Sequence, residues 1–143
     1  MDAIKDVAHS WTNTQTVFLR TSVVLLALTT AGIHASLGGI LFTINAVGYT
    51  ALAVAMILPG RIGGIRWLIR LALIGFTAAT IAGWVIFGAR FPLAYLDKSL
   101  EVVLIVFVTL EVWLLDGGPS GVARRMRRLL DSVAATVLAQ GER

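Results

Sequence analysis

Three carboxylates lie inside a mostly apolar stretch that runs from Tyr95 to a fourth carboxylate, Asp116. Drawn as a helix with about 100° per residue, the stretch places Asp97, Glu101 and Glu111 within an arc of about 80°. Bulky apolar residues occupy the opposite side of this helix, at Val102, Val106, Leu110 and Trp113. A helix of this kind in lipid must turn its acids toward protein or a water-filled cavity. The stretch therefore predicts that other helices surround it.

Further polar residues lie at the same depth as Asp97 and Glu101 when the other apolar stretches are drawn as helices. Together they form a candidate ligand or proton site near the outer membrane surface, made of His34, Asn45, Tyr49, Trp84, Asp97, Lys98 and Glu101. Histidine and carboxylates at membrane depth are typical of proton relays, cation sites and ligand pockets. Interhelical hydrogen bonds that only hold a bundle together would give the same pattern. The sequence leaves both interpretations open.

Two arginines lie at the depth of Glu111, near the inner membrane surface. An isolated carboxylate inside a membrane is costly, and an arginine on a neighbouring helix is its natural partner. We therefore expect a structural ion pair between Glu111 and Arg70, or between Glu111 and Arg20 in place of Arg70.

Motifs for enzyme catalysis are missing from the sequence. There is no cysteine, which excludes disulfides, thiolate metal sites and cysteine nucleophiles. A phosphate-binding glycine loop, a His-Glu-x-x-His zinc motif and a serine nucleophile elbow are also missing. His34 is the only histidine in the apolar stretches, so a bis-histidine haem within one chain is not expected. The sequence requires no metal and no cofactor, but it is compatible with a haem, a quinone or a pigment.

The composition indicates which elements must position these residues. Of 143 residues, 57% are hydrophobic and 14% are charged, and the mean hydropathy is +0.86. This is too little charge to cover a soluble globule, so we expect an integral membrane protein. The apolar runs supply four segments of about 20 residues, the length that crosses a bilayer. They cover residues 18–37, 40–58, 67–88 and 94–116, and their short connections predict an all-α, up-down-up-down four-helix transmembrane bundle.

Lysine and arginine residues are distributed unevenly over this predicted topology. Arg90 and Lys98 lie on one side of the membrane. The other side carries Lys5, Arg20, Arg61, Arg66, Arg70, Arg124, Arg125, Arg127 and Arg128. The positive-inside rule then places both termini in the cytoplasm and the chain in the cytoplasmic (inner) membrane of a bacterium or archaeon.

Two terminal segments flank the predicted bundle. Residues 1–17 form a cytoplasmic N-terminal segment whose apolar spacing would suit a short amphipathic helix. Residues 117–143 are predicted to form a basic amphipathic helix and tail on the cytoplasmic membrane surface. We expect the arginines of this helix to bind anionic lipid, and they are Arg124, Arg125, Arg127 and Arg128. A basic tail that only sets the membrane orientation, or a tail that binds an acidic partner protein, would show the same pattern.

The third predicted span carries a face of small residues, namely Ala72, Gly75, Ala79 and Gly83. Small residues at every third or fourth position allow two helices to approach closely. This face would suit a helix of another chain, or a neighbouring helix of the same chain.

These features favour a non-catalytic function. We expect an accessory or structural subunit of a membrane complex, or a homo-oligomer, with lipid and other membrane proteins as partners and no nucleic acid. One alternative is an oligomeric transporter or channel for ions, protons or small solutes that uses His34 and Glu101. Another alternative is a membrane protein that binds haem, quinone or a pigment.

Overall fold

The computed structural model describes the backbone of residues 2–59 and 64–141, and the side chains of residues 14–59, 64–138 and 140. Within these ranges the chain is helical apart from short connections. The helices are α1 (Asp2–Leu37), α2 (Ile40–Ile57), α4 (Arg66–Phe87), α5 (Pro92–Asp116) and α6 (Gly118–Gly141). The predicted all-α class is confirmed.

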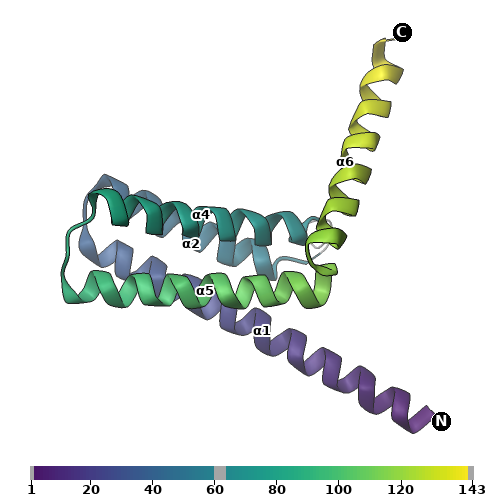
Figure 1. Ribbon diagram of the computed structural model, residues 1–143, viewed down its shortest axis with the longest axis horizontal. Coiled ribbons are helices and arrows are strands. Elements are labelled where there is room, and N and C mark those ends of the chain that lie inside the picture. The colour runs from purple at the N-terminus through teal and green to yellow at the C-terminus, as the bar shows by residue number, and fades with distance from the viewer. Residues whose placement is uncertain (1, 60–63, 142–143) are drawn as a thin grey trace.

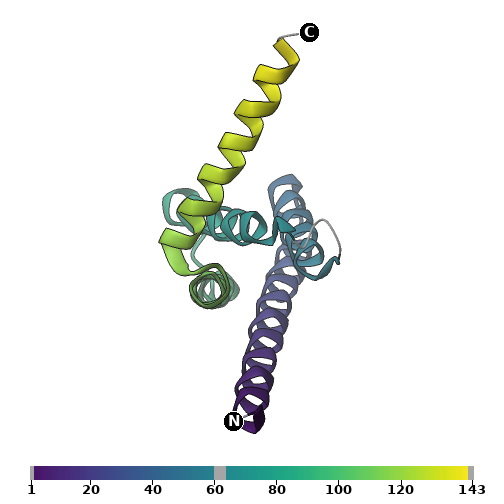
Figure 2. The same ribbon diagram turned by 90° about the vertical axis from the view of Figure 1, so that its right-hand side faces the viewer.

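Four of these helices lie side by side (Figure 1). α1 contacts α2 and α5, and α4 contacts the same two helices, so the four form a closed ring of neighbours. The N-terminal part of α1 extends beyond the other three helices, and α6 contacts α5 and then projects away from the ring (Figures 1 and 2). The ring is the part of the molecule that can enclose a site.

The ring has two ends, which we name after the predicted topology. The outer end carries the α1–α2 connection at Gly38 and Gly39 and the α4–α5 connection over residues 88–91. At the inner end, α5 passes into α6 through Gly117. The backbone φ angles are 70° at Gly38, 89° at Gly39 and 77° at Gly117, and glycine adopts these left-handed values at low cost. These glycines explain why α1 and α5 end where they do.

The helix limits can be compared with the predicted spans. α2, α4 and α5 begin and end within two residues of the predicted limits. α1 differs, because it continues without a break from Asp2 through the boundary predicted after residue 17. Residues 2–17 are therefore the first part of a long helix and not a separate surface helix. Side chains before Thr14 and the loop residue Arg61 lie outside the described residues.

Three helices are long and apolar enough to cross a membrane: Thr14–Leu37 within α1, the whole of α2 and the whole of α4. The chain is therefore consistent with a membrane protein. α5 has 25 residues, but it also carries five charged residues and does not belong to this group by composition. α5 could cross a membrane only if those five side chains point into the protein and away from lipid.

Apolar side chains occupy both the interior and the outward surface of the ring. The buried core includes Val23, Ala27, Tyr49, Ala53, Met56, Leu73, Leu104 and Val108. Large apolar side chains that point outward include Phe18, Leu25, Val106, Leu114 and Trp113. Soluble proteins rarely expose continuous apolar surface of this kind, whereas lipid-facing helices do.

Candidate functional site

All five charged residues of α5 point into the protein. Asp97, Lys98, Glu101, Glu111 and Asp116 are each at most 9% exposed, and both glutamates are completely buried. The outward side of α5 carries Val102, Val106, Leu110 and Trp113, which are exposed. The two faces of α5 are thus divided as the helical projection predicts. The buried groups form two separate clusters, one toward each end of the ring.

The outer cluster consists of His34 from α1 and Asp97, Lys98 and Glu101 from α5. The Lys98 ammonium lies between the two carboxylates, with Nζ 3.0 Å from Asp97 Oδ2 and 2.7 Å from Glu101 Oε1. The first turns of α5 produce this arrangement, because residues four apart lie on the same side of a helix. α5 therefore supplies two negative charges and one positive charge at the outer end.

The His34 imidazole lies against the same two carboxylates. Its Nδ1 is 2.9 Å from the Thr30 carbonyl oxygen and 3.6 Å from Asp97 Oδ1, and its Nε2 is 3.9 Å from Glu101 Oε1. A carbonyl oxygen can only accept a hydrogen bond, so Nδ1 carries the hydrogen. Nε2 is then the nitrogen that gains or loses a proton, and it faces Glu101.

Hydroxyl groups from two further helices complete the surroundings of Glu101. The Tyr49 hydroxyl of α2 donates to Glu101 Oε1 at 2.9 Å and lies 2.9 Å from Thr80 Oγ1 of α4. Thr80 donates its own hydrogen to the Thr77 carbonyl at 2.8 Å. Sequence analysis did not single out Thr80, although Thr77, Thr80 and Trp84 follow one another at helical spacing on α4.

Two carboxylate oxygens of the outer cluster lack a hydrogen-bond partner among the described residues. They are Asp97 Oδ1 and Glu101 Oε2, and both side chains are at most 3% exposed. Buried carboxylate oxygens are usually hydrogen-bonded, so each unpartnered one calls for an explanation. These two oxygens are places where a proton or a ligand donor would be stabilised.

A cavity of about 460 Å³ lies next to the outer cluster. Its polar lining consists of His34, Asn45, Thr80, Asp97 and Lys98. Its aromatic lining consists of Phe42, Phe76, Trp84, Phe87 and Phe91. A mostly apolar cavity of this size with a few convergent polar groups is the usual form of a small-molecule site.

Glycine and alanine residues make room for this cavity. A Cβ atom at Gly48 would lie 2.5 Å from Phe76 Cζ, so the glycine lets the Phe76 ring pack directly on the α2 backbone. The Phe76 ring in turn contacts the Tyr49 ring edge-on, with their centroids 4.9 Å apart. Ala79 and Gly83 line the cavity on the α4 side. Two members of the predicted helix-packing face therefore lie at the cavity.

Trp84 forms part of the cavity rim and makes no hydrogen bond to the outer cluster among the described contacts. Its indole Nε1 donates to the Ala89 carbonyl at 3.1 Å, and the Arg90 guanidinium lies over its ring at 4.3 Å from the centroid. Tyr95 contacts the same ring edge-on at 5.2 Å. The α4–α5 connection is therefore packed onto Trp84 and closes one side of the cavity.

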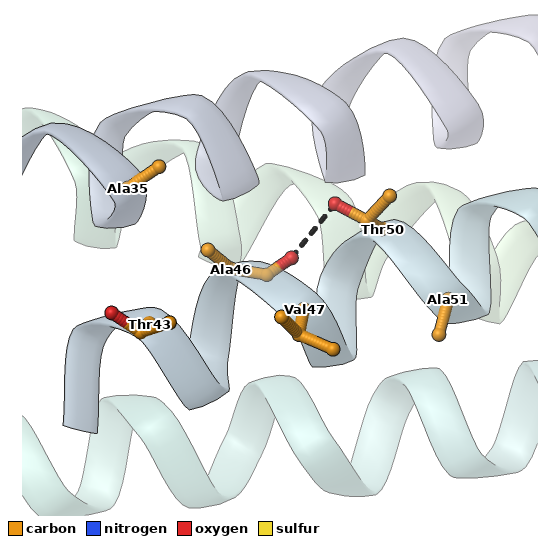
Figure 3. Close-up of a pocket in the computed structure, with 6 residues that line it drawn as sticks. All are labelled: Ala35, Thr43, Ala46, Val47, Thr50 and Ala51. Carbon is orange, nitrogen blue, oxygen red and sulfur yellow. Dashed lines mark hydrogen bonds between the residues drawn. The ribbon is translucent and has the colours of Figure 1, made fainter. Parts of the chain in front are cut away.

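The remaining small residues lie on outward surfaces. Ala72 and Gly75 of α4 are exposed. A second pocket lies where α1 and α2 meet, and Figure 3 shows its lining of Ala35, Thr43, Ala46, Val47, Thr50 and Ala51. The Thr50 hydroxyl donates to the Ala46 carbonyl of its own helix at 2.8 Å. No ionisable side chain lines this pocket, so its chemistry is limited to packing.

The inner cluster consists of Arg20 of α1, Arg70 of α4, and Glu111 and Asp116 of α5. Arg70 donates to Glu111 Oε1 at 3.1 Å and to Asp116 Oδ2 at 2.7 Å. Arg20 Nε lies 3.4 Å from Glu111 Oε1. Both arginines expected from the sequence therefore lie beside Glu111. Sequence analysis took Asp116 only as the end of a span and missed it as a partner.

One arginine of α6 also reaches the inner cluster. Arg125 Nη1 lies 2.8 Å from Asp116 Oδ1, and its side chain is 37% exposed. The other arginines predicted to bind a lipid surface, namely Arg124, Arg127 and Arg128, are exposed on α6. Arg125 thus connects α6 to the ring, and three arginines remain for a surface.

Among the described side chains, His34, Asp97 and Glu101 offer donor atoms within 4.8 Å of one another, which is a donor set suited to a cation. The Lys98 ammonium already lies against both carboxylates. We therefore interpret the outer cluster as a site for positive charge and assign no metal to it. The chain matches no protein-family model, no curated protein and no solved structure, so its function is argued from this geometry alone.

Proposed function

We propose that α1, α2, α4 and α5 all cross the membrane as a four-helix bundle. The burial of every charged side chain of α5, together with its exposed apolar side, supports α5 as the fourth crossing. A charged side chain in lipid is costly, and turning it inward toward partners removes much of that cost. Helix α5 therefore fits a membrane better than its composition indicates.

The orientation and location belong to the same proposal. Both termini lie in the cytoplasm, the membrane is the cytoplasmic (inner) membrane, and Arg124, Arg127 and Arg128 bind anionic headgroups beside it. The charge asymmetry of the sequence and the exposure of these arginines support this arrangement. Because the chain has no cysteine, a single cysteine introduced at Gln140 can report the orientation. Labelling of that cysteine from outside intact cells would contradict the proposal.

The function that the geometry supports best is the binding of a lipophilic small molecule at the outer end of the bundle. The observation that carries this proposal is the aromatic-walled cavity with His34, Asp97 and Lys98 in its lining. Aromatic walls bind the apolar body of a ligand, and the few buried polar groups orient its head. Haem, quinones, pigments and other lipophilic molecules of comparable size are the candidate ligands.

Conduction through a single chain is less well supported. Between the two clusters, the buried core is formed by apolar residues such as Val23, Ala53, Leu73, Leu104 and Val108. An ion or proton pathway needs polar groups or water along its length. A transporter that uses His34 and Glu101 would therefore need a second conformation or a second chain.

The binding proposal can be tested by filling the cavity. Ala79 and its neighbour Ala78 are both exposed, but only Ala79 lines the cavity. The substitution Ala79→Phe should abolish saturable binding of a lipophilic ligand, and Ala78→Phe should leave it intact. Binding is measured by calorimetry in detergent, with ligands chosen from what mass spectrometry and absorption spectra find in protein purified from native membranes. Equal binding by both variants, or no ligand and no saturable binding at all, would overturn the proposal.

A second candidate function is that of an accessory subunit or a homo-oligomer, as the sequence favoured. The specific observation for it is the exposure of Ala72 and Gly75 on α4, where a Cβ at Gly75 would meet nothing within 4 Å. Small residues that no part of the chain covers allow another helix to approach. The substitution Ala72→Leu should then dissociate a native complex or dimer, and Val102→Leu on the lipid side of α5 should not. A wild-type protein that is monomeric and free of partners in mild detergent would contradict this candidate.

A further inference from the structure

The outer cluster contains more negative than positive charge. Asp97 and Glu101 contribute two negative charges, and Lys98 contributes one positive charge. The remaining facing groups are His34 from α1, Tyr49 from α2 and the uncharged Thr80 from α4. With His34 and Tyr49 neutral, the cluster carries one negative charge that no described side chain compensates.

A buried negative charge without a partner is costly, so the cluster must hold one further positive charge. Without a ligand, a proton meets this need, and three positions accept it: His34 Nε2, Asp97 Oδ1 and Glu101 Oε2. The hydroxyl groups cannot replace it, because Tyr49 already donates to Glu101 and Thr80 donates to the Thr77 carbonyl. The further positive charge is therefore a proton that another cation can replace.

This exchangeable charge lies in the wall of the cavity. His34 and Asp97 both line the cavity, and the unpartnered Asp97 Oδ1 is a buried atom of one of these two side chains. A ligand in the cavity is therefore in position to supply the missing positive charge itself. In doing so it would displace the proton, since the cluster needs only one further positive charge.

The walls of the cavity favour an organic cation over a metal ion. Five aromatic rings line it, and aromatic faces attract ammonium and guanidinium groups. At the rim, the Arg90 guanidinium already lies over the Trp84 ring in this way. A divalent metal ion would instead require several oxygen or nitrogen ligands to replace its water, and in the nearest set, His34, Asp97 and Glu101, the Lys98 ammonium already lies against both carboxylates.

We propose that the ligand of the outer cavity is a lipophilic amine, bound as its cation with the ammonium at Asp97 and exchanged for one proton. This inference rests on the proposed binding function and specifies its ligand class. The ammonium donates to Asp97 Oδ1 while the apolar body lies against the aromatic walls. The proton that the cluster held is released to solvent, so atoms and charges balance.

The experiment compares 1-naphthylmethylamine with 1-naphthylmethanol, which have the same skeleton and differ in charge. Calorimetry of the full-length protein in detergent, repeated in buffers of different ionisation enthalpy, gives the affinity and the number of protons released. The wild type should bind the amine roughly tenfold or more tightly than the alcohol, which corresponds to a difference of about 1.4 kcal/mol or more. It should release about one proton per amine, because amine and proton compete for one charge. Amine affinity should therefore rise with pH, because fewer protons then compete with the amine for the cluster.

Two substitutions change the charge of the cluster in opposite directions. Asp97→Asn removes the uncompensated negative charge, so amine affinity should fall roughly tenfold to the level of the alcohol, without proton release. Lys98→Met adds to the uncompensated charge, so amine affinity should rise. Asp97→Glu should restore wild-type behaviour, and alcohol affinity should stay constant across the series.

The outcomes separate this inference from the proposed function. Equal affinity for amine and alcohol in the wild type, or amine affinity that Asp97→Asn does not change, would overturn the amine inference and leave the binding site intact. Tight binding of a neutral quinone whose affinity is the same in the wild type, Asp97→Asn and Lys98→Met would also overturn the amine inference and leave the binding site intact. If neither probe binds and no other ligand is displaced by Ala79→Phe, the binding function itself fails.

Discussion

The outer and inner clusters lie on the same face of α5, yet they differ in chemistry and in charge balance. In the inner cluster, the guanidinium groups of Arg20, Arg70 and Arg125 face Glu111 and Asp116, so three positive charges meet two negative charges. Arginine stays protonated under all ordinary conditions, which fixes that balance. The outer cluster uses lysine, histidine and two carboxylates, whose charges can change, and it carries one unmatched negative charge.

The two clusters also differ in whether they lie between packed helices or beside a cavity. The inner cluster is formed between packed helices and is joined to α6 through Arg125. The outer cluster borders a cavity of about 460 Å³. A set of permanently charged guanidinium groups paired with carboxylates is suited to holding helices in register. A set of ionisable groups with an excess negative charge beside a cavity is suited to exchanging a charge with a ligand. Both clusters would look alike in a hydropathy plot.

The largest expected effect comes from removing one negative charge at each end of α5. Glu111→Gln leaves Arg70 buried beside a neutral amide, and we expect the free energy of unfolding to fall by about 3 kcal/mol. Glu101→Gln removes a charge that has no complete partner, while its amide oxygen still accepts from Tyr49 and Lys98. We expect that change to alter the free energy of unfolding by less than about 1 kcal/mol. The measurement is unfolding by denaturing detergent in mixed micelles, followed by circular dichroism.

Arg125→Gln serves as the control, because its side chain is 37% exposed. We expect that substitution to cost at most about 1 kcal/mol, as surface pairs do. If Glu101→Gln destabilised the protein as much as Glu111→Gln, the outer cluster would also serve mainly to hold the helices together. The proposed difference between the two clusters would then be wrong.

Helical periodicity accounts for the part of this architecture that sequence analysis predicted. The acids of α5 face inward because their spacing places them on one side of any helix, and the neighbouring helices of the ring cover that side. The pairing of Glu111 with Arg70 follows from depth alone, since few cations lie at the same level. The turn at Gly38 and Gly39 follows from a stretch that is too long for one crossing.

The cavity could not be predicted in this way, because it depends on which helices become neighbours and how closely they approach. Nothing in the sequence places Gly48 of α2 against Phe76 of α4, or directs Ala79 and Gly83 toward the space beside His34. The same small residues would equally suit contact with another helix, as the sequence suggested. The role of Asp116 was missed because it is the last residue of the predicted span, where a carboxylate could be hydrated and needs no arginine partner such as Arg70.

A smaller effect, confined to the outer end, should follow from Gly48→Ala. The new Cβ atom would lie 2.5 Å from Phe76 Cζ, so the ring must move, and overpacking of this kind costs about 1–3 kcal/mol. Because Phe76 lines the cavity, ligand affinity should also decrease. The matched control is Gly75→Ala on the outward side of α4, where no atom lies within 4 Å of the new Cβ. That change should leave binding intact and either preserve stability or raise it by up to about 1 kcal/mol.

The free energy of unfolding and the ligand affinity of Gly48→Ala have to be compared to interpret this substitution. Loss of stability together with loss of binding indicates that the α2–α4 contact shapes the cavity, and that the outer end is built around a ligand. Loss of stability with unchanged binding would mean that Phe76 can move without narrowing the cavity, and its place in the wall would be incidental. Added to Glu111→Gln, the Gly48→Ala change should lower stability by an independent amount, because the two sites share no contact and distant substitutions are additive. A non-additive result would show that the two ends of the bundle are coupled through α5. The inner cluster could then no longer be treated as a structural element that is independent of the outer binding site.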